Sequence, residues 1–502
     1  MSDDGRSYRD IFRSSSIMGG ANGLNYLVAL VRVKIIAVLL GPAGVGLVSL
    51  YMSAIGLIGT VSGLGIGSSG VREVALAFSQ QNPTAAARTV RLLRRACWAT
   101  GLLGWVLAAA LSPLLSTWVS GSTEHAVAIS VLGVTLLLGA VNGGQTAMLQ
   151  GARRIGDIAR ANVAAMLLNT GVAIGLYAWM GQRGIVPVLV VTAAVALAVS
   201  WWFARRVHVE PVALSWPDTF AGTRRLAGLG MAFMWSGLLT AGLDMATRSL
   251  ITQNLGIDAA GLYQAAWALS GMFAGFILSA MGTDFFPRLT SVIHDQELAS
   301  STVNEQTEIG ILMALPGLLG TLAFAPWMME AFYTKEFLPG AALLPWFIVG
   351  IFGRIVSWPM GFIQLAKGAS GWFVTTETVF AGLQLGLLFW VVPLIGLVGV
   401  AYVFAITYLL YTLGMLRVAK ALIGFQWSEE VKKLLMLSSI FVLVGLGVRL
   451  AMPGWAGTLA GGAVTLMAVI LSLRGLAARL GADSRLCKIV FMVPGGRLIM
   501  GV

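Results

Sequence analysis

Long, uninterrupted apolar runs recur from one end of this 502-residue chain to the other. A helix that crosses the ~30 Å hydrocarbon core of a bilayer needs about 20 mostly apolar residues, whereas the strands of a membrane barrel would alternate apolar and polar residues. The runs here are continuous, so they predict helices. Only 11% of the residues are charged, against about 25% in soluble globular chains. Because this deficit extends over the whole length, we expect an all-α polytopic membrane protein.

About fourteen transmembrane helices are predicted, separated by Gly-Pro, Gly-Gly and charged clusters. The apolar segments lie at roughly 14–40, 45–68, 95–117, 125–150, 156–180, 184–204, 226–255, 259–282, 308–331, 339–365, 371–395, 397–416, 434–452 and 455–475. The breaks at Ile395–Gly399 and Pro453–Gly454 are the weakest, so twelve or thirteen spans are the alternatives. The first run is too long for a signal peptide, and we expect it to be retained.

The distribution of positive charge predicts the orientation of these spans. With the N-terminus in the cytoplasm, 26 of the 33 Lys and Arg residues fall on the cytoplasmic side, 3 fall in the opposite loops and 4 lie within spans. Cytoplasmic loops of membrane proteins carry such an excess. Topology therefore explains the net charge of +12, and nucleic acid is not an expected partner. We predict a multi-pass membrane protein with cytoplasmic N- and C-termini.

An internal repeat divides the chain. "LLGPAGVGLVSLYMSAIGLI" from Leu39 resembles "NLGIDAAGLYQAAWALSGMF" from Asn254, with a shift of 215 residues that matches Gly41 to Gly256 and Gly46 to Gly261. Chance similarity of Gly- and Leu-rich helices is the alternative. The repeat predicts an N-lobe of six spans at 1–210, a C-lobe of six spans at 220–425, and two further helices with a cytoplasmic tail at 426–502. Parallel repeats of this kind are a transporter architecture with a substrate site near the midplane.

Two cations lie inside the first span. Arg32 is nine residues before Gly41, which places it about 13 Å from that end at 1.5 Å per residue, near the middle of the membrane. Charges at this depth usually face a wet cavity or each other. Lys34 is shallower and about 200° around the helix from Arg32, so it could instead extend to the outer interface.

Later spans carry further charges. Asp244 and Arg248 on the seventh span have the i,i+4 spacing of an ion pair. The pair could be purely structural, or Asp244 could hold Arg248 until an anionic ligand competes, or take up a coupling proton. Arg354 lies midway along the tenth span with no acid within one turn. Glu377, on the eleventh span, could pair with Arg354, titrate, or simply be hydrated.

Cations outnumber acids at the midplane, so a cavity lined by these spans would attract an anion. Arginine suits phosphate because its planar fork matches two oxygens. The predicted anion-binding residues are therefore Arg32, Arg248, Arg354 and Lys34. Polar and aromatic side chains in the spans would suit a sugar, although each could equally serve helix packing. The sugar-contact candidates are Asn25, Asn142, Gln145, Gln264 and Trp267.

The cationic first span, followed by "AVLLGPAGVGLVSLY" and "GLGIGSSGVREVA", resembles the Wzx-type polysaccharide flippases of the multidrug/oligosaccharidyl-lipid/polysaccharide (MOP) exporter superfamily. The likeness covers nearly the whole chain in topology and is specific in about the first eighty residues. It implies two six-helix lobes around a central cavity that opens alternately to either side. It also implies an undecaprenyl-pyrophosphate-linked oligosaccharide, such as an O-antigen or exopolysaccharide repeat unit, as the substrate.

In related flippases of lipid-linked precursors, cationic cavity residues on the first and later spans engage the pyrophosphate. By position that role would fall on Arg32 and Arg248, with Lys34 and Arg354 as further candidates. The two extra terminal spans depart from twelve-span members, and in some relatives such helices form a groove for the lipid tail. Membrane lipids and other polysaccharide assembly proteins are further candidate partners.

Two other functions stay open. A multidrug or organic-cation exporter of the same superfamily should have an acidic cavity, and a polysaccharide polymerase or glycosyltransferase typically needs a large external loop, whereas the predicted external loops are short. The sequence has no Gly-rich phosphate loop, GxSxG elbow or HExxH helix. Its two cysteines and three histidines do not have metal-ligand spacing. We therefore expect a transporter rather than an enzyme, with no metal and no cofactor.

Overall fold

The computed structural model describes the backbone of residues 4–79, 83–152, 154–207, 209 and 212–480. Within these ranges the side chains at 4–27, 67–68, 72, 79, 225–233, 273, 276, 279–284 and 480 lie outside the described set. Every regular element in the described ranges is a helix. Ten helical stretches of the described residues are long and apolar enough to cross a membrane, which confirms the predicted all-α polytopic class.

The number of spans is less fixed than the class. Two of the ten stretches, Val28–Gly63 and Ile155–Ala204, each contain two predicted spans. The ten do not include α8 or α9, each of which contains side chains outside the described set. The count of fourteen therefore stays a prediction.

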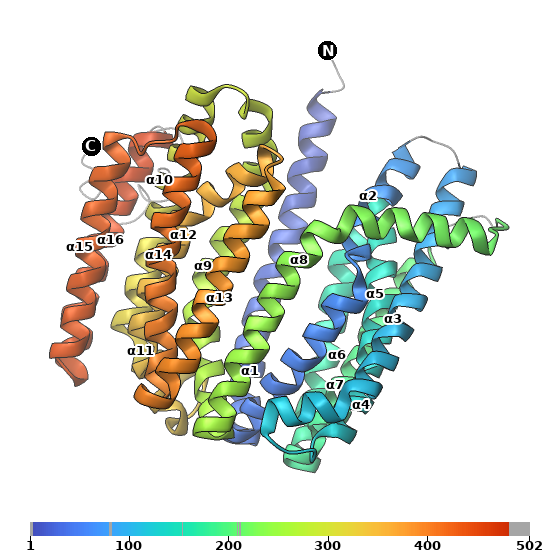
Figure 1. Ribbon diagram of the computed structural model, residues 1–502, viewed down its shortest axis with the longest axis horizontal. Coiled ribbons are helices and arrows are strands. Elements are labelled where there is room, and N and C mark those ends of the chain that lie inside the picture. Colours follow the sequence, from blue (N-terminus) through green and yellow to red (C-terminus); the bar gives the residue numbers. More distant parts are fainter. Residues whose placement is uncertain (1–3, 80–82, 153, 208, 210–211, 481–502) are drawn as a thin grey trace. The chain divides into compact units, whose positions relative to one another are not determined.

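The chain separates into two compact units, residues 1–261 and 262–502. The first unit contains the blue to green helices of Figure 1. Its elements are α1 (Asp4–Gly63), α2 (Ile66–Ser79), α3 (Pro83–Ser120), α4 (Ala126–Leu132), α5 (Val134–Gly151), α6 (Ile155–Met180), the short η1 (Gly181–Gly184), α7 (Ile185–Ala204), α8 (Trp216–Leu255) and the start of α9 (Ile257–Val292).

The second unit holds the rest of α9 and the later helices. These are α10 (Gln296–Ala323), α11 (Ala325–Phe332), η2 (Lys335–Ala342), α12 (Leu344–Ala366), α13 (Ser370–Ile395), α14 (Leu397–Ile423), α15 (Glu429–Ala451) and α16 (Gly454–Leu480). The two weakest predicted breaks coincide with helix boundaries here, because α13 ends at Ile395 and α15 ends at Ala451. Gly396 and Gly454, which follow these ends, have positive φ values of 78° and 77°.

The repeat seen in the sequence has a structural counterpart. Gly41 breaks α1 with φ 64° and ψ −174°, and its match Gly256 separates α8 from α9 with φ 87° and ψ 169°. Only glycine adopts this backbone conformation readily. The other matched pair makes a reciprocal contact: a Cβ on Gly46 would lie 2.3 Å from the Ile257 oxygen, and one on Gly261 would lie 1.9 Å from the Pro42 oxygen. The duplicated turns thus pack backbone to backbone.

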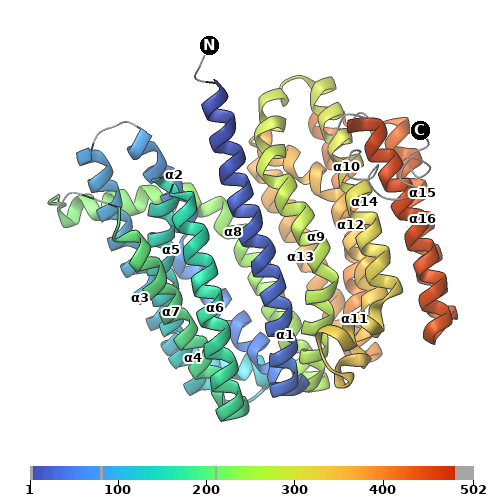
Figure 2. The same ribbon diagram turned by 180° about the vertical axis from the view of Figure 1, so that it is seen from behind.

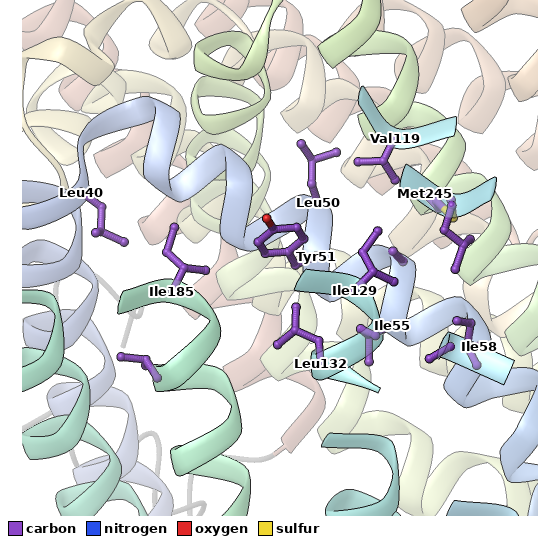
Figure 3. Close-up of a cluster of buried hydrophobic side chains, with 14 of the residues drawn as sticks. Leu40, Leu50, Tyr51, Ile55, Ile58, Val119, Ile129, Leu132, Ile185 and Met245 are labelled. Atoms are coloured by element: carbon purple, nitrogen blue, oxygen red, sulfur yellow. The ribbon is translucent and has the colours of Figure 1, made fainter. Parts of the chain in front are cut away.

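The first unit has its core where α1 bends. α1 packs against α3, α6 and α8, and α6 lies beside α1 in Figure 2. Leu50, Tyr51 and Ile55 of α1 meet Ile129 and Leu132 of α4 in this buried cluster (Figure 3). α8 belongs to the same unit through its contacts with α1, α2 and α3.

The second unit is organised around α10 and α12. α10 packs against α12, α15 and α16, and α12 packs most extensively against α14. A buried cluster joins Phe285 of α9 to Val303 of α10, Met360 of α12 and Met415 of α14. The compact units divide after Gly261, so α8 lies with the first unit. The lobe boundaries predicted from the sequence follow the internal repeat, whereas the compact units follow contacts between helices. The predicted lobes therefore stay a prediction.

Candidate functional site

An ion pair forms in the part of α8 that the sequence predicts to span the membrane, at 226–255. Arg248 Nη1 pairs with Asp244 Oδ1, and the same nitrogen donates to the Asp244 backbone oxygen at 3.3 Å. The Arg248 side chain is 8% exposed and that of Asp244 is 35% exposed. Asp244 is eleven residues from the end of α8 at Leu255, or about 16 Å at 1.5 Å per residue. The predicted ion pair therefore forms, at a position well inside the span predicted at 226–255.

Asp244 lies on the wall of a groove between α1 and α8. The groove has a volume of about 420 Å³. Its lining is almost free of bulky side chains and consists of Met52, Ser53, Gly56, Thr60, Ser236, Gly237, Thr240, Ala241 and Asp244. Small residues let two helices approach closely or leave space beside them. The carboxylate faces this space, while its partner Arg248 is not among the lining residues.

The two cations of the first span are positioned differently. Arg32 and Lys34 are both half-buried on α1. Arg32 interacts electrostatically with Tyr177 of α6, a residue that is 3% exposed. Neither cation lines the groove of Asp244. Within the first unit, Arg32 therefore lies near Tyr177 of α6, whereas the groove lies along the later half of α1.

The second unit has its own charged group. Arg354 of α12 is exposed, although every other residue from 350 to 357 is buried. Its guanidinium carbon lies 5.8 Å from the centre of the Tyr408 ring. Glu377 of α13 is half-buried and accepts a hydrogen bond from the Tyr411 hydroxyl at 2.9 Å. Glu377 and Arg354 interact electrostatically, but no direct ion pair joins these two described residues. Tyr408 and Tyr411 of α14 therefore contact the two charged residues.

Removing the Tyr411 hydroxyl should weaken the second unit. Tyr411→Phe deletes the hydrogen bond to a half-buried carboxylate, and we expect a loss of about 1.5–3 kcal/mol of stability, measured as thermal unfolding in detergent. Tyr402→Phe is the matched control, because Tyr402 contacts Trp346 edge-on and its hydroxyl makes no hydrogen bond to any described residue. Equal unfolding temperatures for the two variants would contradict the expectation.

The remaining sequence candidates fall at separate places. Asn142 lines a small cavity of about 70 Å³ between α5, α6 and α7, and Gln145 lines a different, larger cavity. Gln264 is half-buried on α9. Trp267 stacks on Tyr263 with ring centres 6.2 Å apart and meets Phe404 edge-on at 5.1 Å. Asn25 lies outside the residues whose side chains are described. The sugar-contact roles of these residues stay predictions.

Sequence reasoning did not find the tyrosines or the groove. Tyr408 and Tyr411 reach Arg354 and Glu377 from a different helix, and nothing in the local sequence marks that contact. The sequence does contain a signal for the groove. Small residues recur at 53, 56 and 60 on α1, and small residues at 236 and 240 on α8 are followed at the same spacing by Asp244. Such spacings of three or four residues place side chains on one face of a helix.

Solved structures identify the class of this fold. The lipid II flippase MurJ, in an inward closed conformation, aligns with a TM-score of 0.66 at 11% identity, covering 93% of this chain and 100% of that one. An inward-facing multidrug resistance MATE family transporter of the MOP superfamily aligns with a TM-score of 0.63 at 17% identity, covering 82% and 96%. The chain therefore has the fold of MOP superfamily transporters, as predicted from its first spans.

A family assignment follows from the sequence itself. The family model described as "Polysaccharide biosynthesis protein" matches residues 35–342, and the chain belongs to this family. The lipid III flippase of Escherichia coli (strain K12) is 22% identical over 390 residues, covering 75% of this chain and 90% of that protein. These relatives are named as flippases or transporters and not as enzymes, which agrees with the predicted class.

Proposed function

We propose that this protein is a flippase that moves a lipid-linked oligosaccharide across the cytoplasmic membrane. Its family, the lipid III flippase relative and the MurJ-like fold support this function. The observation that carries it is the Arg248–Asp244 pair beside a groove, at a depth that the sequence predicts to be near the middle of the membrane. A soluble role needs no ion pair at this depth, and a purely structural pair needs no groove beside it.

The pair suits a substrate that carries phosphate. The Asp244 carboxylate neutralises the Arg248 guanidinium. A phosphate group entering the groove presents negative charge and two oxygens in a similar plane, so it can replace the carboxylate on the guanidinium fork. Asp244, which is one-third exposed, can then turn to water or accept a proton. Arg354 is the corresponding exposed cation of the second unit.

The finer substrate assignment also belongs to this proposal. We assign an undecaprenyl-pyrophosphate-linked repeat unit of O-antigen or exopolysaccharide type, with Arg32 and Lys34 as further pyrophosphate contacts and Asn142, Gln264 and Trp267 as sugar contacts. The protein would lie in the inner membrane with both termini in the cytoplasm and work by alternating access. Other polysaccharide assembly proteins are proposed partners.

Reconstitution tests the activity directly. The purified full chain is placed in vesicles with a fluorescent undecaprenyl-pyrophosphate-linked oligosaccharide, and a membrane-impermeant quencher reports how fast the label reaches the outer leaflet. We expect faster translocation than in protein-free vesicles. An unaccelerated rate with several repeat units of different sugar composition would count against the proposal.

A second candidate function is export of organic cations. It is favoured by one observation: the side chain on the groove wall is the acid Asp244, whereas Arg248 is buried behind it. The same vesicles, loaded with ethidium and given a proton gradient, separate the two functions. Ethidium efflux without oligosaccharide translocation would favour export of organic cations. We expect oligosaccharide translocation without ethidium efflux.

A further inference from the structure

The first unit contains a second, larger cavity that the proposed transport does not use. It has a volume of about 690 Å³ and lies between α3, α5, α7 and the segment after α7. Two arginines, two tryptophans and one glutamine line it together with apolar side chains. The polar and aromatic members are Arg94, Trp98, Gln145, Trp201 and Arg205.

This cavity lies at the boundary between the apolar and polar parts of the unit. Arg94 lies two residues before the apolar stretch of α3, which begins at Ala96, and Arg205 directly follows α7. Trp98 and Trp201 lie four residues further into the apolar part of each helix and are 56% and 53% exposed. Tryptophan is enriched at the level of lipid headgroups because its ring is apolar and its N–H is polar. The cavity is therefore at headgroup depth on the arginine-rich side, which we predict to be cytoplasmic.

The arginines here divide into two groups. Arg95 donates to the Leu214 oxygen at 2.9 Å and to Thr219 at 2.8 Å, and Arg91 donates to the Val212 oxygen. These two fasten the segment after α7 to α3. Arg94 and Arg205 line the cavity instead. Among the described residues, which do not include Glu210, no carboxylate forms an ion pair with either of them.

The contacts of Arg94 and Arg205 with other described residues are weak and leave their charge available. Arg94 Nη2 contacts the Met148 sulfur at 3.6 Å, and the Arg205 guanidinium lies 3.6 Å from the centre of the Trp202 ring. A thioether is a poor acceptor, and an aromatic face leaves the guanidinium edge open for hydrogen bonds. Two cations on one cavity favour a phosphate group.

Gln145, which lines the same cavity, carries a buried polar atom. Gln145 is 9% exposed, and its Oε1 is buried without a hydrogen-bond partner in the described part of the chain. A buried acceptor left unpaired costs about 1–3 kcal/mol. The missing partner must be a donor, such as a hydroxyl group. The apolar walls, which include Leu138 and Leu197, exclude a ligand that is polar throughout.

We propose that this cavity binds one anionic glycerophospholipid of the phosphatidylglycerol class from the adjacent leaflet. Its phosphate contacts Arg94 and Arg205, a headgroup hydroxyl donates to Gln145 Oε1, and the acyl chains follow the apolar walls. Basic pockets between membrane helices are known to recognise such headgroups. The site is separate from the groove of Asp244 and does not depend on the transported substrate.

Lipid titration followed by native mass spectrometry tests the site. The full-length protein in detergent is titrated with phosphatidylglycerol or phosphatidylcholine. Arg94→Gln/Arg205→Gln should weaken binding of the first phosphatidylglycerol by roughly 10- to 30-fold, since each interfacial arginine contributes about 1 kcal/mol. The matched control, Arg88→Gln/Arg206→Gln, removes two exposed arginines of the same segments that do not line the cavity. It should leave the affinity nearly unchanged.

A second variant keeps the test valid if the double variant folds poorly. Gln145→Leu should weaken phosphatidylglycerol but not phosphatidic acid, whose headgroup lacks glycerol hydroxyls. Three results would overturn the proposal: equal phosphatidylglycerol affinity in the wild type and Arg94→Gln/Arg205→Gln, displacement of the lipid by excess inorganic phosphate, or preferential occupation by undecaprenyl phosphate. The last would assign the cavity to the carrier lipid.

Discussion

Asp244→Asn is expected to lower the stability of the protein by about 3 kcal/mol, because it removes the carboxylate that the structure pairs with a buried guanidinium. This value is at the lower end for a broken buried pair, since Asp244 is one-third exposed and an amide oxygen still accepts a hydrogen bond. Arg248→Gln should cost less, because the carboxylate left behind can reach water in the groove. Thermal and denaturant unfolding in detergent measure both.

The double variant separates a structural role from a functional one. Asp244→Asn/Arg248→Gln leaves no unbalanced charge, so it should recover most of the stability lost by Asp244→Asn, with a coupling of about 1–3 kcal/mol in the double-mutant cycle. If Arg248 holds the substrate phosphate, the double variant is folded but translocates at least about tenfold more slowly. Arg183→Gln, an exposed arginine of η1, is the control. If the double variant translocates the substrate at the wild-type rate, the ion pair has only a structural role.

Local pattern was sufficient to predict much of the fold. The length of the apolar runs predicted the helices. The glycine in each copy of the repeat predicted where α1 bends and where α8 ends, because glycine is the residue that adopts a positive φ readily. The i,i+4 spacing predicted the Arg248–Asp244 pair for the same reason: both partners lie on one helix. These features depend on neighbours a few residues apart, so they can be read along the chain.

Contacts between distant helices could not be read in this way. Tyr411 reaches Glu377 across 34 residues, and the cavity around Gln145 needs α3, α5 and α7 together. The sequence proposes Gln145 for sugar contact because it is polar and within a span. That role stays a prediction, since depth along one helix does not specify which neighbours surround a side chain. The association of α8 with the first unit likewise depends on contacts between helices. The repeat alone would assign α8 to the C-lobe.

The reciprocal glycine contact gives the second large prediction. Gly261→Ala should destabilise the first unit by about 3 kcal/mol, the upper part of the usual cost of overpacking, because its Cβ would lie 1.9 Å from the Pro42 oxygen. Gly46→Ala, at 2.3 Å from the Ile257 oxygen, should have a similar effect. Both obstacles are backbone atoms, so no side-chain rotation relieves the clash.

Gly171→Ala in α6 is the matched control, because nothing lies within 4 Å of its added Cβ and alanine favours a helix over glycine by about 0.8–1 kcal/mol. The two substitutions should therefore shift the unfolding temperature in opposite directions. Gly46→Ala and Gly261→Ala strain the same contact between the duplicated turns, so their combination should cost less than the sum of the single effects. A fully additive double variant, or a Gly261→Ala protein as stable as Gly171→Ala, would show that the two turns do not share one packing contact.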